Sequence, residues 1–425
     1  MKKSSRVVIT GLGAVTPLGN EVASTWRRLK NGESGAGVIT RFDHNEEFPT
    51  RIACEVKDFD PLTFLEKKEA RRFDRFTQYA LKASDEAIAH SGLEDGSDFL
   101  EPERFGVIFG SGIGGITTLE DQHDVLREKG PRFVSPFFIP MFIPDIAAGL
   151  ISIKAGAKGP NYATVSACAS SAHAICDAYR YIASGEADVM VAGGSESTLT
   201  PLAVMGFANM KALSRRNENP EEASRPFDSG RDGFVIGEGA GAVLLESLEM
   251  AQKRGAKIIA EIVGYGVSAD AHHITLPAPE GEGAQYAMQR ALESANLRPQ
   301  DVDYINAHGT STMANDRNET IAIRTVFGDY ADELLVSSTK SMTGHLLGAA
   351  GGVETIISAL VCSEDLVPPT INYTDPDPDC DLNYVPNHLI ESEISVALSN
   401  SFGFGGHNAC VAPVSYTHLT LPTKA

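Results

Sequence analysis

The chain has 425 residues, of which 56 are acidic and 36 are basic, so its formal net charge is -20. This negative charge opposes binding to a phosphate backbone and argues against nucleic acid as the main partner. With 42% hydrophobic and 22% charged residues, the chain is not disordered, and its length suits two or three domains or one large layered fold.

Repeated segments dominate the order of the predicted elements. Three pairs match: strands over 7–10 and 258–263, strands over 188–194 and 395–401, and small-residue helices over 170–183 and 348–360. We therefore expect two copies of one α/β unit, with parallel strands covered by helices on both faces.

The N-terminal copy is about 46 residues longer between its matching segments. We assign the excess to residues 113–160, rich in Gly, Phe and Pro, because insertions of this size often build sites or subunit contacts. The resulting domains are an N-terminal half over 1–256, which holds the insertion, and a C-terminal half over 257–412. Residues 413–425 continue no apolar pattern and are expected to be a non-native or disordered tail.

Amphipathic helices are predicted over 73–90 and 282–295. We find no continuous 18-residue apolar run, so no membrane span is expected. Gly11 and Gly13 interrupt the apolar stretch near the N-terminus, and no signal peptide is expected. Six cysteines without a CxxC pair indicate reduced thiols, as in a cytoplasmic protein.

Cys168 is the strongest candidate for a reactive residue. It lies in Thr164–Ala174 (TVSACASSAHA), where a short β-rich run turns into a helix of small residues. Unpaired amides at a helix start stabilise a thiolate, and small neighbours admit a substrate. The alternative, a buried structural cysteine, is the default for a single cysteine and the interpretation we favour for the other five.

Two histidines occupy similar positions at the ends of predicted strands. His308 lies in NAHGTST and His345 in KSMTGHLLGAAG, both Gly-containing turns that follow a strand. Ligands of α/β proteins bind at the carboxyl ends of strands, so we expect both histidines near Cys168. No HExxH sequence, dinucleotide-binding glycine pattern or P-loop is present, which disfavours metalloprotease, nicotinamide and nucleotide sites.

Together, SACASSAHA, HGTST, KSMTGH and NSFGFGGHN over residues 400–408 closely resemble the β-ketoacyl-[acyl-carrier-protein] synthases. The resemblance spans about residues 5–412 in the family's order. It implies a thiolase-like five-layer α-β-α-β-α sandwich of two pseudo-symmetric halves, a homodimer, and a decarboxylative condensation that extends an acyl chain by two carbons.

The resemblance also assigns roles to individual residues. Cys168 would be the acylated nucleophile, and the amides of Cys168 and Phe404 would hold the oxyanion. His308 and His345 would bind the thioester oxygen of malonyl-ACP, and this pair matches the elongation class rather than the initiation class. Lys340 would support the histidines, with Glu319 expected as its ion partner.

Further positions match the family's binding sites. Thr310 and Thr312 would hydrogen-bond the phosphopantetheine arm that carries the substrate, and Phe402 would line its path. No dissociable cofactor is required. Four residues match a monovalent-cation site seen in part of the family: Asn306, Glu354, Ser399 and Asn400.

The partner implied, acyl carrier protein (ACP), is itself acidic, so this acidic chain needs a local basic surface. Residues 66–75 have a net charge of +2, and their basic side chains follow the spacing of one helix face. The resemblance places ACP docking at Lys68, Arg71 and Arg72, with Lys211. An ordinary solvated helix face is the alternative.

Three other functions remain open at this point. One is another thiolase-superfamily enzyme, such as a CoA-dependent thiolase or a polyketide ketosynthase. Another is a non-catalytic chain-length-factor subunit, against which Cys168 argues. A cysteine hydrolase is the third, but it assigns no role to HGTST or KSMTGH.

Overall fold

The computed structural model describes residues 5–93 and 100–416. Its main sheet has ten strands, five from each half of the chain. Those of the N-terminal half are β1 (Val7–Val15), β4 (Phe105–Gly110), β5 (Asn161–Tyr162), β6 (Val189–Glu196) and β7 (Gly239–Ser247). Those of the C-terminal half are β8 (Ala260–Ala269), β9 (Tyr304–Asn306), β10 (Leu335–Ser337), β13 (Ala397–Gly403) and β14 (His407–Ser415).

The strand order reveals the internal repeat. It runs β10-β9-β13-β14-β8-β1-β7-β6-β4-β5, so each half has the same order outward from the central antiparallel pair β1–β8. In each half the second strand from the centre, β7 or β14, is antiparallel to both of its neighbours. The outer three strands of each half run parallel to one another. The two copies predicted from the sequence are thus confirmed by the topology.

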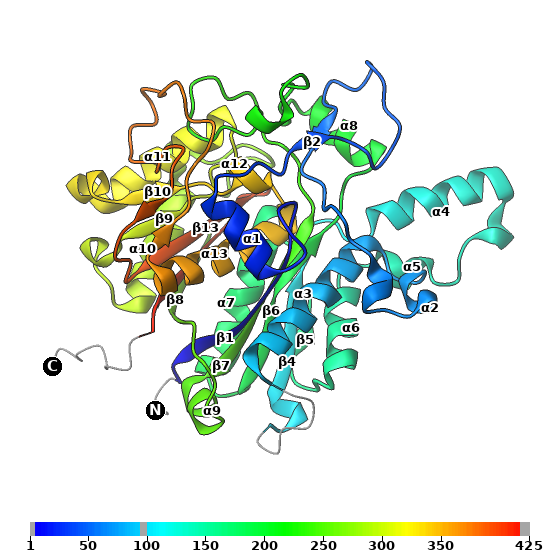
Figure 1. Ribbon diagram of the computed structural model, residues 1–425, viewed down its shortest axis with the longest axis horizontal. Coiled ribbons are helices and arrows are strands. Elements are labelled where there is room, and N and C mark those ends of the chain that lie inside the picture. Colours follow the sequence, from blue (N-terminus) through cyan, green and yellow to red (C-terminus); the bar gives the residue numbers. More distant parts are fainter. Residues whose placement is uncertain (1–4, 94–99, 417–425) are drawn as a thin grey trace.

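Helices complete five layers. On one outer face α3 (Arg75–Ser91) packs on β1, β6 and β7 beside α6 (Ile146–Ala155), and on the other α10 (Glu282–Ala295) packs on β8 and β14 beside α11 (Met313–Phe327). Between the two halves of the sheet lie α7 (Ser170–Ala183) and α13 (Ala350–Glu364), which contact strands of both halves (Figure 1). The α-β-α-β-α prediction is confirmed.

Small residues allow the two central helices to approach closely. A Cβ atom at Gly351 would lie 2.8 Å from the Cβ of Ala172, and the Gly352 N–H donates to Ser171 Oγ at 2.8 Å. Within the described residues, Leu347–Glu364 is the one helical stretch long and apolar enough to cross a membrane, and 83% of it is buried. It is accounted for as the core helix of the central layer.

The remaining elements connect these layers. They are α1 (Val22–Lys30), β2 (Gly37–Val38), β3 (Ile52–Ala53), α2 (Lys67–Ala70), α4 (Ile116–Lys129), α5 (Phe138–Phe142), α8 (Pro201–Asn209), α9 (Leu248–Lys253), α12 (Lys340–Thr343), β11 (Leu366–Val367) and β12 (Ile390–Glu391). Figure 1 shows α4 projecting away from the layered body.

The extra residues of the N-terminal half lie mainly elsewhere than predicted. The connection from β1 to α3 covers 16–74, whereas that from β8 to α10 covers only 270–281. The connection from β4 to β5, over 111–160, is also longer than that from β9 to β10, over 307–334. This excess is offset because the connection from β10 to β13, over 338–396, is longer than that from β5 to β6. Assigning the excess to 113–160 alone was therefore wrong, because spacing between repeats counts extra residues without locating them.

Two predicted boundaries also change. The helix face expected over residues 68–75 is interrupted, because Asp74 begins a new helix by accepting the Phe76 N–H, and its second oxygen binds Thr118. At the other end, β14 continues past residue 412, with Ser415 paired to Ala260. Residues 413–415 thus belong to the sheet rather than to a tail, and residues 417–425 lie outside the described residues.

Candidate active site

Cys168 lies on a sharp turn between the sheet and the central helix layer. It is the middle residue of a 3₁₀ turn, Ala167–Ala169, that leads directly into α7. Ala167 has a φ of +50°, an unusual conformation for a residue with a side chain. Gly403 lies against this turn: a Cβ there would be 2.8 Å from Ser166 O and 3.1 Å from Cys168 N. This packing brings the β13–β14 turn to the thiol.

Two backbone amides point at the sulfur. The backbone N–H groups of Phe404 and of Cys168 itself both lie near Sγ, where each acts to lower the pKa of the thiol. Burial raises the pKa of Cys168 to about 11, and the Phe404 amide and the Lys340 ammonium oppose that rise. The resting thiol is therefore protonated at neutral pH, and the two amides are placed to bind negative charge that develops there.

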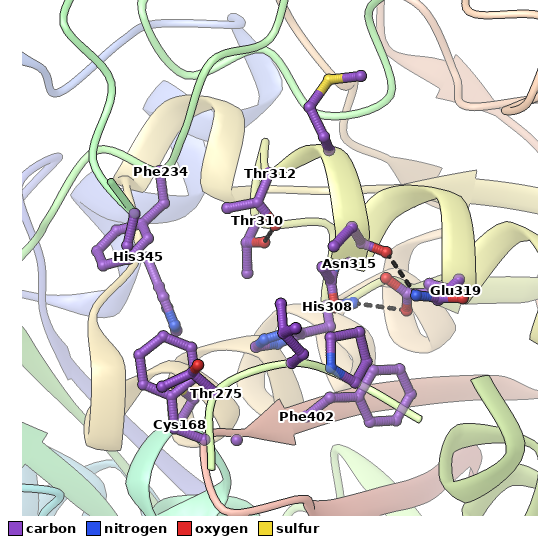
Figure 2. A pocket seen from close by; sticks show the side chains of 18 of the residues that line it. Cys168, Phe234, Thr275, His308, Thr310, Thr312, Asn315, Glu319, His345 and Phe402 are labelled. Carbon is purple, nitrogen blue, oxygen red and sulfur yellow. Dashed lines mark hydrogen bonds between the residues drawn. The ribbon is translucent and has the colours of Figure 1, made fainter. Parts of the chain in front are cut away.

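His308 and His345 face the thiol from the C-terminal half. His308 follows β9 and His345 follows α12, and one nitrogen of each ring lies within 4.8 Å of Cys168 Sγ and of the other nitrogen (Figure 2). The rings meet edge to face with centroids 5.3 Å apart. Burial, with Lys340 nearby, lowers both histidine pKa values well below 6.5, so both rings are neutral at pH 7.

Among residues 5–93 and 100–416, neither ring has the carboxylate partner that a general base in a triad uses. The Nδ1 atoms of His308 and His345 are buried without a hydrogen-bond partner among the described residues. A neutral imidazole that lacks a charged orienter can donate a hydrogen bond but is poorly prepared to store a proton. This arrangement argues against the hydrolase alternative.

Cys168, His308 and His345 also lie close enough to bind a metal ion together. A zinc site would need the thiolate form of Cys168 in surroundings that tolerate a further cation. Here the buried Lys340 ammonium already acts on all three groups, lowering the pKa of each. A thiol that burial keeps protonated at neutral pH, beside an ammonium group, therefore disfavours a divalent cation here.

The ion pairing behind the histidines differs from the prediction. Lys340 is 1% exposed and pairs with Glu354, not with Glu319. Glu319 instead accepts the backbone N–H groups of His308 at 2.8 Å and Gly309 at 2.7 Å, and burial raises its pKa to about 7. Glu319 thus positions the turn that carries His308, while Glu354 neutralises the buried lysine.

A cavity of about 330 Å³ opens onto these three groups. Thr310 and Thr312 line it and share a hydrogen bond of 2.9 Å between their hydroxyls, and Phe402 packs edge to face on His308 (Figure 2). Phe404 lines the cavity from the β13–β14 turn, and Lys211 also lines it. The residues predicted to bind the substrate arm are thus gathered around one space.

Phe234 is a site residue that the sequence did not indicate. Its ring lies edge to face on His345 at 5.3 Å and lines the cavity. It comes from an irregular connection between β6 and β7 and carries no motif. Only the folded chain brings it to the histidine.

The four residues predicted to bind a cation are only partly together. Asn306 and Ser399 are paired across β9 and β13, so their side chains share a face. The side chain of Asn400 points to the other face, where its Nδ2 donates to Glu319 at 3.2 Å, so only the backbone carbonyl of Asn400 is left for this group. Glu354 is engaged by Lys340 through one oxygen only.

The basic residues predicted to dock ACP are dispersed. Lys68 and Arg71 are exposed, whereas Arg72 is half-buried with its guanidinium 4.1 Å from the centre of the Phe137 ring. Lys211 lies at the cavity after α8, and Figure 1 places α8 away from α2. Within one chain these residues do not form a single patch.

The five layers, the internal repeat and the Cys–His–His site define a condensing enzyme of the thiolase-like class. The chain belongs to the β-ketoacyl synthase family. The model of the family's N-terminal domain matches residues 4–251, and the model of its C-terminal domain matches residues 259–374.

Relatives and solved structures agree with this assignment. Proteins named 3-oxoacyl-[acyl-carrier-protein] synthase 2 from Staphylococcus aureus (strain COL) and Synechocystis sp. are 54% and 52% identical, covering 96% and 97% of this chain and 98% and 99% of theirs. A β-ketoacyl synthase from Burkholderia phymatum superposes with a TM-score of 0.90 at 36% identity, covering 97% of this chain and all of that one. A type II polyketide ketosynthase solved with its acyl-carrier protein (AntDE:AntF) gives the same TM-score, identity and coverage.

Proposed function

We propose that this protein is a 3-oxoacyl-ACP synthase that elongates fatty acyl chains by decarboxylative condensation. One observation carries the proposal: a buried thiol, two neutral imidazoles and two amide donors converge on a single cavity. The relatives that are 52–54% identical to this chain are named 3-oxoacyl-[acyl-carrier-protein] synthase 2. The polyketide ketosynthase is only 36% identical to it. Fatty acid elongation is therefore favoured over polyketide synthesis.

Acyl transfer is the first half-reaction. Cys168 Sγ attacks the thioester carbonyl of acyl-ACP, and the oxyanion is held by the amides of Cys168 and Phe404. The C–S bond to the phosphopantetheine breaks as the new C–S bond to Cys168 forms. The proton of the Cys168 thiol leaves with the phosphopantetheine sulfur, so this step needs no net proton.

Condensation is the second half-reaction. The thioester oxygen of malonyl-ACP accepts hydrogen bonds from His308 and His345 while the malonyl C–C bond breaks and carbon dioxide leaves. The enolate carbon attacks the acyl carbonyl on Cys168, and the tetrahedral oxyanion occupies the same two amides. Its collapse releases 3-oxoacyl-ACP and the Cys168 thiolate, which is then reprotonated.

The site requires no dissociable cofactor in this scheme. A monovalent cation is proposed as a structural element near Asn306 and Ser399. Supporting it, Asn306 Oδ1 and Glu354 Oε2 are buried without hydrogen-bond partners among the described residues. These oxygens suit a hard cation, which would supply charge balance rather than chemistry.

The partner proposed is ACP, as substrate carrier, and the assembly proposed is a homodimer. The cytoplasm is the proposed location, and all six cysteines being free thiols supports it. Lys68 and Arg71 are proposed to dock ACP on one face, with Lys211 at the cavity mouth.

A reconstituted assay tests the function. Mixed with acyl-ACP and malonyl-ACP, the protein should form 3-oxoacyl-ACP two carbons longer, detected by mass spectrometry. Cys168→Ala should abolish the product, while Cys362→Ala, which removes a buried thiol on α13, should retain it. Product from Cys168→Ala, or none from the unaltered protein, would refute the proposal.

A further inference from the structure

The C-terminal half contains a second copy of the turn that carries Cys168. A 3₁₀ turn, Leu347–Ala349, leads into α13 as Ala167–Ala169 leads into α7. Leu347 has a φ of +49° where Ala167 has +50°. Gly348 therefore occupies the place of the nucleophile in a turn that has no side chain for chemistry.

The carboxylate of Glu196 fills this second turn. Glu196 is the last residue of β6, as Gly403, which precedes Phe404, is the last residue of the matching strand β13. At Cys168 the Phe404 amide points at the sulfur. At Gly348, by contrast, Glu196 Oε2 accepts the N–H at 3.0 Å. The amide equivalent to an oxyanion donor is thus already bound by an internal anion.

Glu196 also connects the turn to the N-terminal half. It accepts the Gly112 N–H at 2.7 Å, the Ile113 N–H at 3.2 Å and the Ser111 hydroxyl at 2.9 Å. These residues follow β4, and Ile113 packs in the apolar cluster that contains Cys168. One carboxylate therefore ties the wall beside the nucleophile to the segment that follows His345.

The surroundings of Glu196 are adapted to a charged carboxylate. It is 0% exposed, and burial raises its pKa, yet its partners are three backbone N–H groups and one hydroxyl. Both glycines are required: a Cβ at Gly112 would lie 2.7 Å from Glu196 Oε2, and one at Gly348 would lie 2.6 Å from it. Such complete pairing is what makes a buried carboxylate tolerable.

His345 is held from two sides. Its N–H donates to Val235 O at 2.8 Å and its carbonyl accepts the Gly237 N–H at 2.9 Å. On its C-terminal side the chain is fixed three residues later, where Gly348 binds Glu196. We propose that Glu196 is a positioning residue that fixes the His345–Gly348 segment for the decarboxylation step, without contacting substrate.

Measuring the rates of the two half-reactions separately distinguishes this positioning role from a merely structural one. Acyl transfer uses Cys168 and two amides, to none of which Glu196 is hydrogen-bonded; its negative charge raises the pKa of Cys168, so removing that charge should not slow acylation. Decarboxylation uses His345. In Glu196→Gln, one NH₂ group must face an N–H donor, so the segment shifts. Single-turnover formation of 3-oxoacyl-ACP by pre-acylated enzyme should fall about 10- to 100-fold, a loss typical of displacement by about 1 Å. Acylation of Cys168 by acyl-ACP should change less than about threefold.

Matched variants control for stability. Glu246→Gln removes another fully buried carboxylate, on β7, where its partners are Arg254 and Thr10, and it should leave the ratio of the two rates unchanged. If Glu196→Gln does not fold, Ser111→Ala removes one hydrogen bond to the same carboxylate and should lower condensation selectively by a smaller factor. Equal losses in both half-reactions, or no loss in condensation, would overturn the proposal.

Discussion

At the scale of single residues, the proposed chemistry depends on two histidines that remain neutral at pH 7. Burial and the Lys340 ammonium both disfavour the imidazolium forms of His308 and His345. A neutral ring can donate a hydrogen bond to an enolate oxygen without transferring a proton. The Lys340–Glu354 pair is therefore part of the electrostatic design, although neither residue lines the cavity.

The depressed histidine pKa values predict the pH profile of condensation. A histidine with an ordinary pKa would become protonated as the pH falls through 6.5. Because the pKa values of His308 and His345 are well below 6.5, the rate of condensation by pre-acylated enzyme should be flat from pH 8 to 6.5. It should decline only at more acidic pH. In Lys340→Met/Glu354→Gln, which removes the ion pair together, the decline should move to higher pH; a wild-type inflection near 6.5 would contradict this.

Gly403 gives a second prediction at this scale. A methyl group there would press on Ser166 O at 2.8 Å and on Cys168 N at 3.1 Å, forcing the Phe404 amide away from the sulfur. Gly403→Ala should lower kcat about 10- to 100-fold, somewhat less than loss of a whole oxyanion donor. Gly37→Ala is the control, since nothing lies within 4 Å of its Cβ position. Steady-state assays that show equal kcat for the two variants would refute the role of this contact.

At the scale of elements, the break between α2 and α3 decides how the basic side chains of residues 68–75 are arranged on the surface. Asp74 caps α3 and separates it from α2, so Lys68 lies on α2 while Arg71 lies in the turn between the helices. Arg72 covers the Phe137 ring and is less available to a partner. The sequence spacing had placed all of these residues on one helix face.

Charge reversal tests the docking surface. Lys68→Glu/Arg71→Glu should raise the KM for acyl-ACP by roughly three- to tenfold at low salt, because both side chains are exposed. The effect should shrink at high salt, where screening acts over a few ångströms. Lys257→Glu/Arg290→Glu makes the same change in charge at exposed positions of the C-terminal half and should leave the KM unaltered. Equal KM changes in the two double variants would exclude this surface.

At the scale of the whole molecule, one edge of the ten-stranded sheet is poorly covered. The edge strand β5 has only two residues, and apolar side chains flank it: Ile153 is 78% exposed and Val165 is 58% exposed. An exposed edge with apolar flanks is a site for pairing with another chain. A second copy that meets this edge about a two-fold axis would cover it.

Light scattering after size-exclusion chromatography tests that assembly. The protein should elute with twice the mass of the chain, and Ile153→Lys/Val165→Lys should shift it toward the monomer because two charges would be buried. Ile274→Lys changes an equally exposed apolar residue, 77% exposed after β8, and should remain dimeric. A monomeric unaltered protein would end this proposal.

The sequence by itself determined the internal repeat and an α/β fold, and it predicted the three residues that the structure brings together at the cavity. This was possible because those features are local: strand and helix periods recur in both halves, and Cys168, His308 and His345 each lie in a turn of distinctive composition. The residue roles themselves came from the family resemblance carried by those motifs.

Only the tertiary structure decided which charges meet. Glu319 and Glu354 are both plausible partners of Lys340 by spacing, but the fold directs Glu319 to the His308 amide and Glu354 to the ammonium. Phe234 reaches His345 from a connection without a motif, and Glu196 binds a glycine in the opposite half. The last two contacts join residues more than a hundred positions apart, so they depend on tertiary packing rather than on any local pattern. Glu319 and Glu354 meet partners only 11 and 14 positions away, but spacing alone did not tell which carboxylate would reach Lys340.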